Sequence, residues 1–190
     1  MRELVFLILA SVSLHAEIID RIVAVVDGHI ITRSDVTQER EIRTILGEKA
    51  IDDKALVEQL TESYLIETQL TGFPGIEVDD EAVAEEMARL PKKEGLSSAA
   101  LRDAVHRRIR TARYLNLRFR QFLRASDEDV RKYYENVFGP EARTRGINPV
   151  PPLEQVTDAV RKNVVEELMD REVTTWLEAI RRRSNLEILD

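Results

Sequence analysis

The chain has 190 residues, of which 43% are apolar and 33% are charged. That balance excludes both an intrinsically disordered chain and one that fills a membrane, and the length allows one ordinary domain or two small ones. The formal net charge of −7 argues against a general nucleic-acid binder, and the absence of cysteine excludes disulfides, thiolate metal sites and cysteine nucleophiles.

The chain begins with a short apolar run. Leu4 to Val12 follow Met1-Arg2-Glu3 and precede Ala16, a small residue of the kind found at signal-peptide cleavage sites. The run is too short to span a bilayer, which takes about 20 residues. We therefore predict a cleaved secretory signal over residues 1–16. The alternative is a buried N-terminal strand or helix.

A small hairpin is expected next. Apolar and β-branched residues fill Ile18 to Val26, and Asp27-Gly28 is a strong two-residue turn signal before the second strand at His29 to Thr32. From residue 34 to about residue 135 the apolar spacing predicts one helix after another. The expected helices cover residues 34–46, 53–71, 79–90, 97–123 with a possible break, and 127–135.

The last third of the chain has a different character. Four of the six prolines and two glycines lie within residues 136–152, which predicts a Gly/Pro-rich linker. Residues 153–183 predict a helix of roughly 46 Å, and Leu186 to Leu189 alternate as a short strand. Because a strand needs a partner, we expect the two chain ends to share one sheet. The predicted fold is mainly α, with a small β-sheet of N-terminal hairpin and C-terminal strand.

Two helices carry apolar residues in unexpected places. Residues 102–124 hold eight arginines, and Tyr114 and Leu117 fall outside the apolar face of this segment. A second helix could cover this pair, or it could form an exposed apolar contact flanked by arginines. The predicted apolar face consists of Val105, Ile109, Ala112, Leu115, Phe119, Phe122 and Leu123.

The long helix presents different apolar faces in its two halves. At about 100° per residue, the faces lie about 160° apart. Either the helix passes from one packed part of the protein into another, or its first half packs against a partner molecule. Trp176 is predicted to be a core residue. The first face holds Leu153, Val156, Val160, Val164 and Leu168, and the second holds Val165, Met169, Val173, Trp176 and Ile180.

Three blocks in this order resemble a known family. Ile19 to Val36 resembles the opening of the SurA-like periplasmic chaperones and parvulin-type isomerases, and Ser126 to Glu135 resembles the segment before their isomerase domain. Asp170-Arg171-Glu172, Trp176-Leu177 and Arg181 to Leu189 are similar to the closing helix and strand of that family.

The chain departs from the family pattern where the isomerase domain would lie. The gap holds the 16 residues Asn136 to Pro151, whereas an independent domain rarely has fewer than about 50 residues. We therefore expect no parvulin domain, no catalytic residue and no enzyme. The expected organisation is a signal at 1–16, a chaperone region at 17–135, a linker at 136–152 and, at 153–190, a closing helix and strand that pack on the chaperone region.

The resemblance implies an ATP-independent periplasmic holdase for unfolded exported polypeptides, with outer-membrane β-barrel precursors as the usual clients. We expect no cofactor, metal, nucleic acid or membrane span. Alternatives are an isomerase-related assembly factor, a homodimer formed by exchange of the long C-terminal helix, and a nucleic-acid-binding helical regulator. The predicted peptide-binding surface consists of Tyr114, Leu117, Leu153, Val156, Val160 and Val164.

Overall fold

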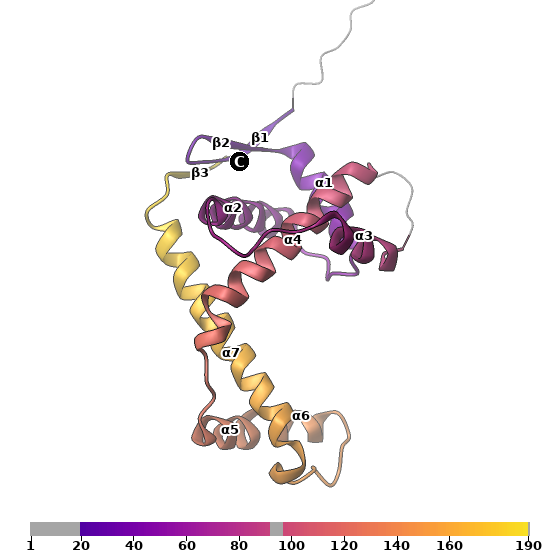
Figure 1. Ribbon diagram of the computed structural model, residues 1–190, viewed down its shortest axis with the longest axis vertical. Helices are drawn as coiled ribbons and strands as arrows, with labels where there is room; N and C mark the ends of the chain where they lie inside the picture. Colours follow the sequence, from indigo (N-terminus) through magenta and orange to yellow (C-terminus); the bar gives the residue numbers. More distant parts are fainter. Residues whose placement is uncertain (1–19, 92–96, 190) are drawn as a thin grey trace, which may run out of the picture.

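The computed structural model describes residues 20–91 and 97–189, so the predicted signal segment lies outside the described residues. The fold is mainly α with one small antiparallel sheet, as the sequence predicts (Figure 1). The elements in chain order are β1 (Ile22–Val26), β2 (His29–Thr32), α1 (Arg33–Ile45), α2 (Asp53–Leu70), α3 (Asp80–Arg89), α4 (Ser98–Arg118), the 3-10 turn η1 (Arg120–Phe122), α5 (Asp127–Tyr133), the π-helical turn η2 (Tyr134–Phe138), α6 (Gly139–Thr144), α7 (Leu153–Arg181) and β3 (Leu186–Ile188).

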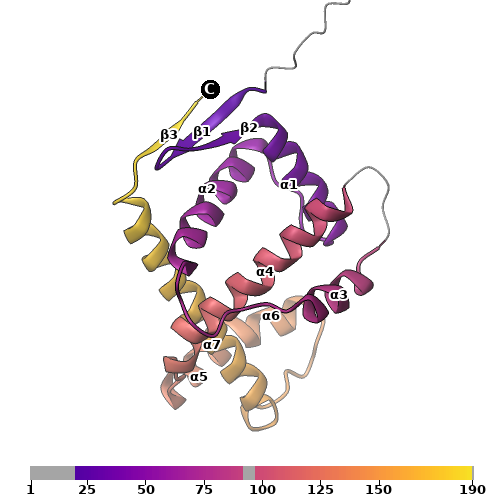
Figure 2. The same cartoon turned by 45° about the horizontal axis from the view of Figure 1, so that its top comes forward.

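The sheet joins the two ends of the described chain. Its strand order is β2-β1-β3, so β1 is central and the C-terminal strand lies beside it (Figure 2). Asp27 and Gly28 have φ values of 49° and 84°, the positive values that a tight hairpin turn of this class requires at both positions. The turn sets Val26 opposite His29 and Val25 opposite Ile30. The predicted pairing of the chain ends is confirmed.

Short polar side chains cap the N-termini of several helices. Thr32 and Asp35 form a capping box at α1, and Ser126 and Asp129 form another at α5. At α2, the Asp52 carboxylate accepts a hydrogen bond from the Ala55 N–H at 2.8 Å. These caps satisfy N–H groups that the first turn of a helix leaves without partners.

The predicted linker at 136–152 is corrected in its first half. Residues 134–144 are helical, as η2 and α6, and the loop covers residues 145–152. The helical run continues without a gap from α5 through η2 into α6, and Pro140 lies directly after the wider π-helical turn. Gly139 is closely packed, since a Cβ there would lie 3.1 Å from the Tyr134 carbonyl oxygen.

The two halves of helix α7 pack in two different parts of the molecule. We call the sheet, α1 to α4 and the C-terminal half of α7 the head, and α5, η2, α6 and the N-terminal half of α7 the lobe (Figure 1). In the head core, Ile180 packs with residues such as Val26 and Leu56; in the lobe core, Val160 and Val164 pack with Val130. The opposite faces of α7 therefore serve separate cores, which is one of the two arrangements that the sequence predicts.

The apolar face predicted for residues 102–124 is wrong in part. Tyr114, which falls outside that face, is 1% exposed, whereas Phe122, which belongs to it, is 72% exposed. The helical period ends at Arg118 and the 3-10 turn η1 follows, so a single helical wheel does not describe the whole segment. Within α4, Tyr114 contacts Phe73 and Trp176, which come from two different neighbours of the helix.

Candidate functional site

The predicted peptide-binding residues do not form one surface. Tyr114 is buried in the head with Leu70 and Ile76, and its ring meets Phe73 edge-on with 4.8 Å between centroids. This burial raises the pKa of the Tyr114 phenol. Leu117, one turn along α4, is 37% exposed. Tyr114 is therefore a core residue, and the expectation that it is accessible is corrected.

The four predicted binding residues of α7 belong to the lobe. Val160 and Val164 are buried against Val130, and Leu153 and Val156 are partly buried beside them. Aromatic side chains of α5 and η2 cover the same face, so it is packed within its own chain in this structure. Exchange of α7 between two copies stays a prediction.

A groove in the head is the better candidate. Two adjoining cavities, of about 430 and about 300 Å³, lie between β2, α1, α2 and α4. We call their joint lining the head groove, and the size of each is in the range of ligand sites in proteins. Both cavities are lined by Glu39, Leu60, Ser63, Glu67 and Arg107.

The lining of the head groove is partly apolar. Leu60, Tyr64 and Ile66 come from α2, and Leu115 comes from α4. The ring of His29, from β2, stacks on Tyr64 with 4.2 Å between centroids and 7° between planes. Such a lining can cover apolar side chains of a bound segment, and its polar groups can meet the backbone of that segment.

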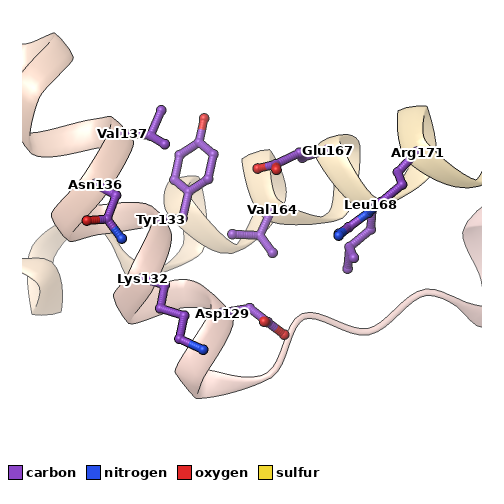
Figure 3. Close-up of a pocket in the computed structure, with 9 residues that line it drawn as sticks. All are labelled: Asp129, Lys132, Tyr133, Asn136, Val137, Val164, Glu167, Leu168 and Arg171. Atoms are coloured by element: carbon purple, nitrogen blue, oxygen red, sulfur yellow. The ribbon is translucent and has the colours of Figure 1, made fainter.

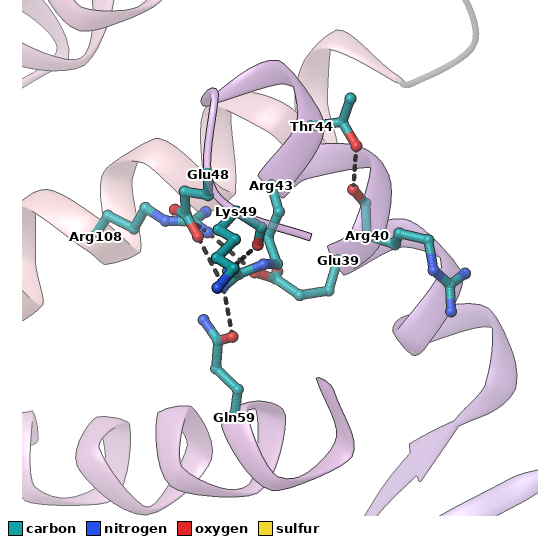
Figure 4. Close-up of polar contacts among 8 residues, drawn as sticks. All are labelled: Glu39, Arg40, Arg43, Thr44, Glu48, Lys49, Gln59 and Arg108. Atoms are coloured by element: carbon teal, nitrogen blue, oxygen red, sulfur yellow. Dashed lines mark hydrogen bonds and ion pairs between the residues drawn. The ribbon is translucent and has the colours of Figure 1, made fainter. Parts of the chain in front are cut away.

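A network of charged groups joins the elements around the head groove (Figure 4). Glu48 accepts from Arg43 at 2.7 Å and from Arg108 at 3.1 Å, and Arg108 also pairs with Glu39 at 3.0 Å. Arg43 is only 13% exposed and donates to the Gln59 amide oxygen at 2.6 Å. Because these residues belong to α1, its following loop, α2 and α4, the network ties the helices that form the groove.

Arg107 is the charged residue of the head groove that stays without a partner. Glu39 pairs with Arg108, and Glu67 pairs with Arg110. Asp35, at the mouth, belongs to the cap of α1. Among the residues that the structure describes, none forms a hydrogen bond, ion pair or ring contact with Arg107. Its guanidinium therefore has five N–H donors free for a ligand.

Other arginines of α4 and η1 are used inside the fold. Arg102 pairs with Asp80, Arg110 with Glu67, and Arg120 with Glu166. Arg118 lies over the Trp176 ring, 5.3 Å from its centroid. The stripe of arginines is thus explained by contacts within the chain, and it gives little support to the alternative of nucleic-acid binding.

The lobe has a smaller cavity of about 260 Å³ (Figure 3). Side chains of α5 and η2 face those of α7 across it, with Val164 and Leu168 among apolar residues and Glu167 and Arg171 among charged ones. Asp129, on its rim, accepts two hydrogen bonds from Ser126, which lower the pKa of the Asp129 carboxyl. Because this cavity is smaller than either part of the head groove and lies beside no strand edge, the head groove is the stronger candidate.

Sequence patterns do not point to the head groove. Leu60 and Tyr64 are one turn apart on α2, which is a detectable signal, but the other walls come from residues far away in the chain. In the described part of the chain, no group of three or more His, Asp and Glu side chains is placed to hold a metal ion. No described helix is both long enough and apolar enough to cross a membrane.

Comparison with known proteins gives a distant similarity to a chaperone. No family model matches the chain. Among curated proteins, Chaperone SurA of Pseudomonas aeruginosa is 26% identical to it over 148 residues, an alignment that covers 66% of this chain. The chain spans 36% of the length of that protein. This similarity supports a SurA-like relationship and suggests a chaperone-like function.

Proposed function

We propose that this protein is an ATP-independent holdase that binds unfolded polypeptide segments in the head groove. The observation that carries the proposal is the head groove itself, which combines an apolar lining with the unpartnered donors of Arg107. The distant similarity to a chaperone supports the same function. Neither feature requires a catalytic group or a nucleotide.

We place this activity in the periplasm, after export and removal of residues 1–16. The proposed clients are exported proteins, above all outer-membrane β-barrel precursors. Such precursors have segments of alternating apolar residues, which aggregate in water when exposed. A groove that covers one segment transiently keeps it from pairing with another. The affinity should be modest, because ordering an unfolded segment costs a few kcal/mol of the interaction energy.

The test is to fill the groove without disturbing the core. Ser63 is exposed on α2 and lines both cavities, so Ser63→Trp places a large ring in the groove. Ala84 is also exposed on a helix, α3, and does not line the groove, which makes Ala84→Trp the matched control. We expect Ser63→Trp to lose most of the suppression of aggregation, while Ala84→Trp keeps it.

Aggregation is measured by light scattering after a urea-unfolded outer-membrane β-barrel precursor is diluted into buffer that contains residues 17–190 or a variant. Circular dichroism of each variant checks that its fold is intact. If folded Ser63→Trp suppresses aggregation as well as the unsubstituted chain does, the head groove is not the client site.

A further inference from the structure

We propose that a client segment binds in the head groove as an additional strand along the free edge of β2. This inference rests on the proposed function and specifies the conformation of the bound segment. The strand order β2-β1-β3 leaves one side of β2 unpaired. Three successive residues of that strand, His29, Ile30 and Ile31, line the larger cavity of the groove. The free edge and the groove therefore adjoin.

The hydrogen bonds of β1 show which backbone groups of β2 are free. The Leu189 N–H donates to the Val23 carbonyl, and the Asp27 N–H donates to the Asn185 carbonyl, both at 2.9 Å. Val23 and Asp27 therefore direct these groups toward β3 and its flanks. Because successive residues of a strand direct their backbone groups to opposite sides, Val25 also faces β3, whereas Ala24 and Val26 face β2.

This alternation determines the direction in which the backbone N–H and carbonyl of Ile30 point. Ile30 lies opposite Val25, whose N–H and carbonyl face β3, so Ile30 and Val25 are a pair that exchanges no hydrogen bonds. The N–H and carbonyl of Ile30 consequently point away from β1, to the open side of the sheet. Ile30 is 49% exposed, so the sheet edge at this residue is open to solvent. The Thr32 N–H, by contrast, already donates to the Asp35 carboxylate at 2.8 Å.

These features define the class of segment that fits. A strand added to β2 exchanges two backbone hydrogen bonds with Ile30, and its side chains alternate between two faces. Apolar residues at alternate positions can then face the lining that includes Leu60 and Tyr64. The unpaired charge of Arg107 favours a segment that also carries a carboxylate. The ligand is therefore an extended segment with alternating apolar residues and one acidic side chain.

Proline at position 30 tests the backbone contact directly. Ile30→Pro removes the outward N–H, and proline is tolerated on an edge strand where this donor is not used by the sheet. Ile30→Thr is the matched control, since it removes the apolar side chain but keeps the N–H and a β-branched residue. We expect Ile30→Pro to weaken peptide binding about fivefold to tenfold, and Ile30→Thr to change it less than about twofold.

The probe is a synthetic peptide of alternating valine and threonine with one glutamate and an N-terminal fluorophore, whose binding is followed by anisotropy. The same peptide is N-methylated at the valines in one version and at the threonines in another; each version keeps the side chains but loses the hydrogen bonds along one edge. The version whose methylated edge meets β2 should bind the unsubstituted chain more weakly by a similar factor. This second arm stays decisive even if Ile30→Pro is misfolded by circular dichroism.

The outcomes separate the inference from the proposed function. Equal binding of the methylated and unmethylated peptides, together with loss of binding in Ser63→Trp, overturns strand addition and leaves a groove that recognises side chains. If no peptide binds the unsubstituted chain, both are overturned. A peptide with lysine in place of glutamate should bind the unsubstituted chain more weakly, and equal binding removes the role assigned to Arg107.

Discussion

At the scale of residues, an aromatic cluster around Tyr114 joins two helices of the head beside its groove. Tyr114 and Phe119 contact the ring of Trp176 with centroid distances of 5.7 and 5.5 Å, and Arg118 lies over all three rings. These contacts join α4 to α7. Because α4 forms one wall of the head groove, the cluster fixes that wall relative to the long helix.

Substitution of Tyr114 tests whether this residue stabilises the fold or contacts the client. We expect Tyr114→Ala to lower the free energy of unfolding by about 3 kcal/mol, because it leaves a cavity where an aromatic side chain is 1% exposed. Leu117→Ala is the control, and its effect should be below about 1 kcal/mol since Leu117 is partly solvated. Urea unfolding, followed by the fluorescence of the single tryptophan, measures both values. An unchanged stability of Tyr114→Ala together with lost client binding would restore Tyr114 as a contact residue.

The sequence predicts correctly which residues of a helix are buried where the helix packs against one neighbour with one face. Trp176 is partly buried and packs against both apolar clusters of the head, in keeping with the prediction from its aliphatic companions on α7. Tyr114 is misassigned because α4 packs on two sides, against α7 and against the loop that carries Phe73. A helical wheel assigns one buried face to a helix, so the sequence leaves open whether a second neighbour covers Tyr114; its contacts with Phe73 and Trp176 show that it is covered.

At the scale of elements, two ion pairs hold the lobe: one joins α7 to η1, and the other lies inside the lobe between α7 and α5. Arg120, in η1, donates to both carboxylate oxygens of Glu166 on α7, at 2.8 and 2.5 Å. Arg161 of α7 donates to Asp127 of α5 at 2.8 Å. The hydrogen bonds from these arginines lower the pKa of the Glu166 and Asp127 carboxyls. Both contacts therefore depend on ionised carboxylates.

Acid should loosen the lobe before it unfolds the head. Each pKa is lower in the folded chain, so the contribution to stability is complete above about pH 4.5 and is lost as the pH falls through the folded values. Hydrogen exchange of α5 amides, measured by NMR from pH 6 to pH 3, should accelerate relative to that of α2 amides, after correction for intrinsic rates. Glu166→Gln should reduce the pH dependence of this ratio. A constant ratio across the range contradicts the prediction.

Element boundaries follow closely from sequence where polar caps mark them. The helices α1 and α2 begin within one residue of the predicted starts. The predicted linker includes residues 136–144 because Gly139 and Pro140 are typical of loops, yet both lie in helical structure, where the π-helical turn η2 leads directly into α6. The head groove could not be predicted, because its walls are joined by contacts such as Arg108 with Glu39, which are remote in the chain.

At the scale of the whole molecule, one helix holds two cores together. The lobe core is closed when α7 covers α5, and the head core is closed when the same helix covers α2 (Figure 1). In the described structure both contacts are made within one chain. Exchange of α7 between two copies would make the same side-chain contacts between two chains.

Crosslinking between α5 and α7 shows whether α7 packs within its own chain or is exchanged between two copies. Because the chain has no native cysteine, only the introduced thiols can react. Asp127 and Arg161 are in direct contact at 2.8 Å, so Asp127→Cys with Arg161→Cys places two thiols within reach of a short bismaleimide. We expect the crosslink to form within one chain, because the loop at residues 145–152 is long enough to return the chain from α6 to α7. The product should then run as a single chain on a denaturing gel at every protein concentration. A covalent dimer that forms equally well on dilution would show instead that α7 is exchanged between two copies.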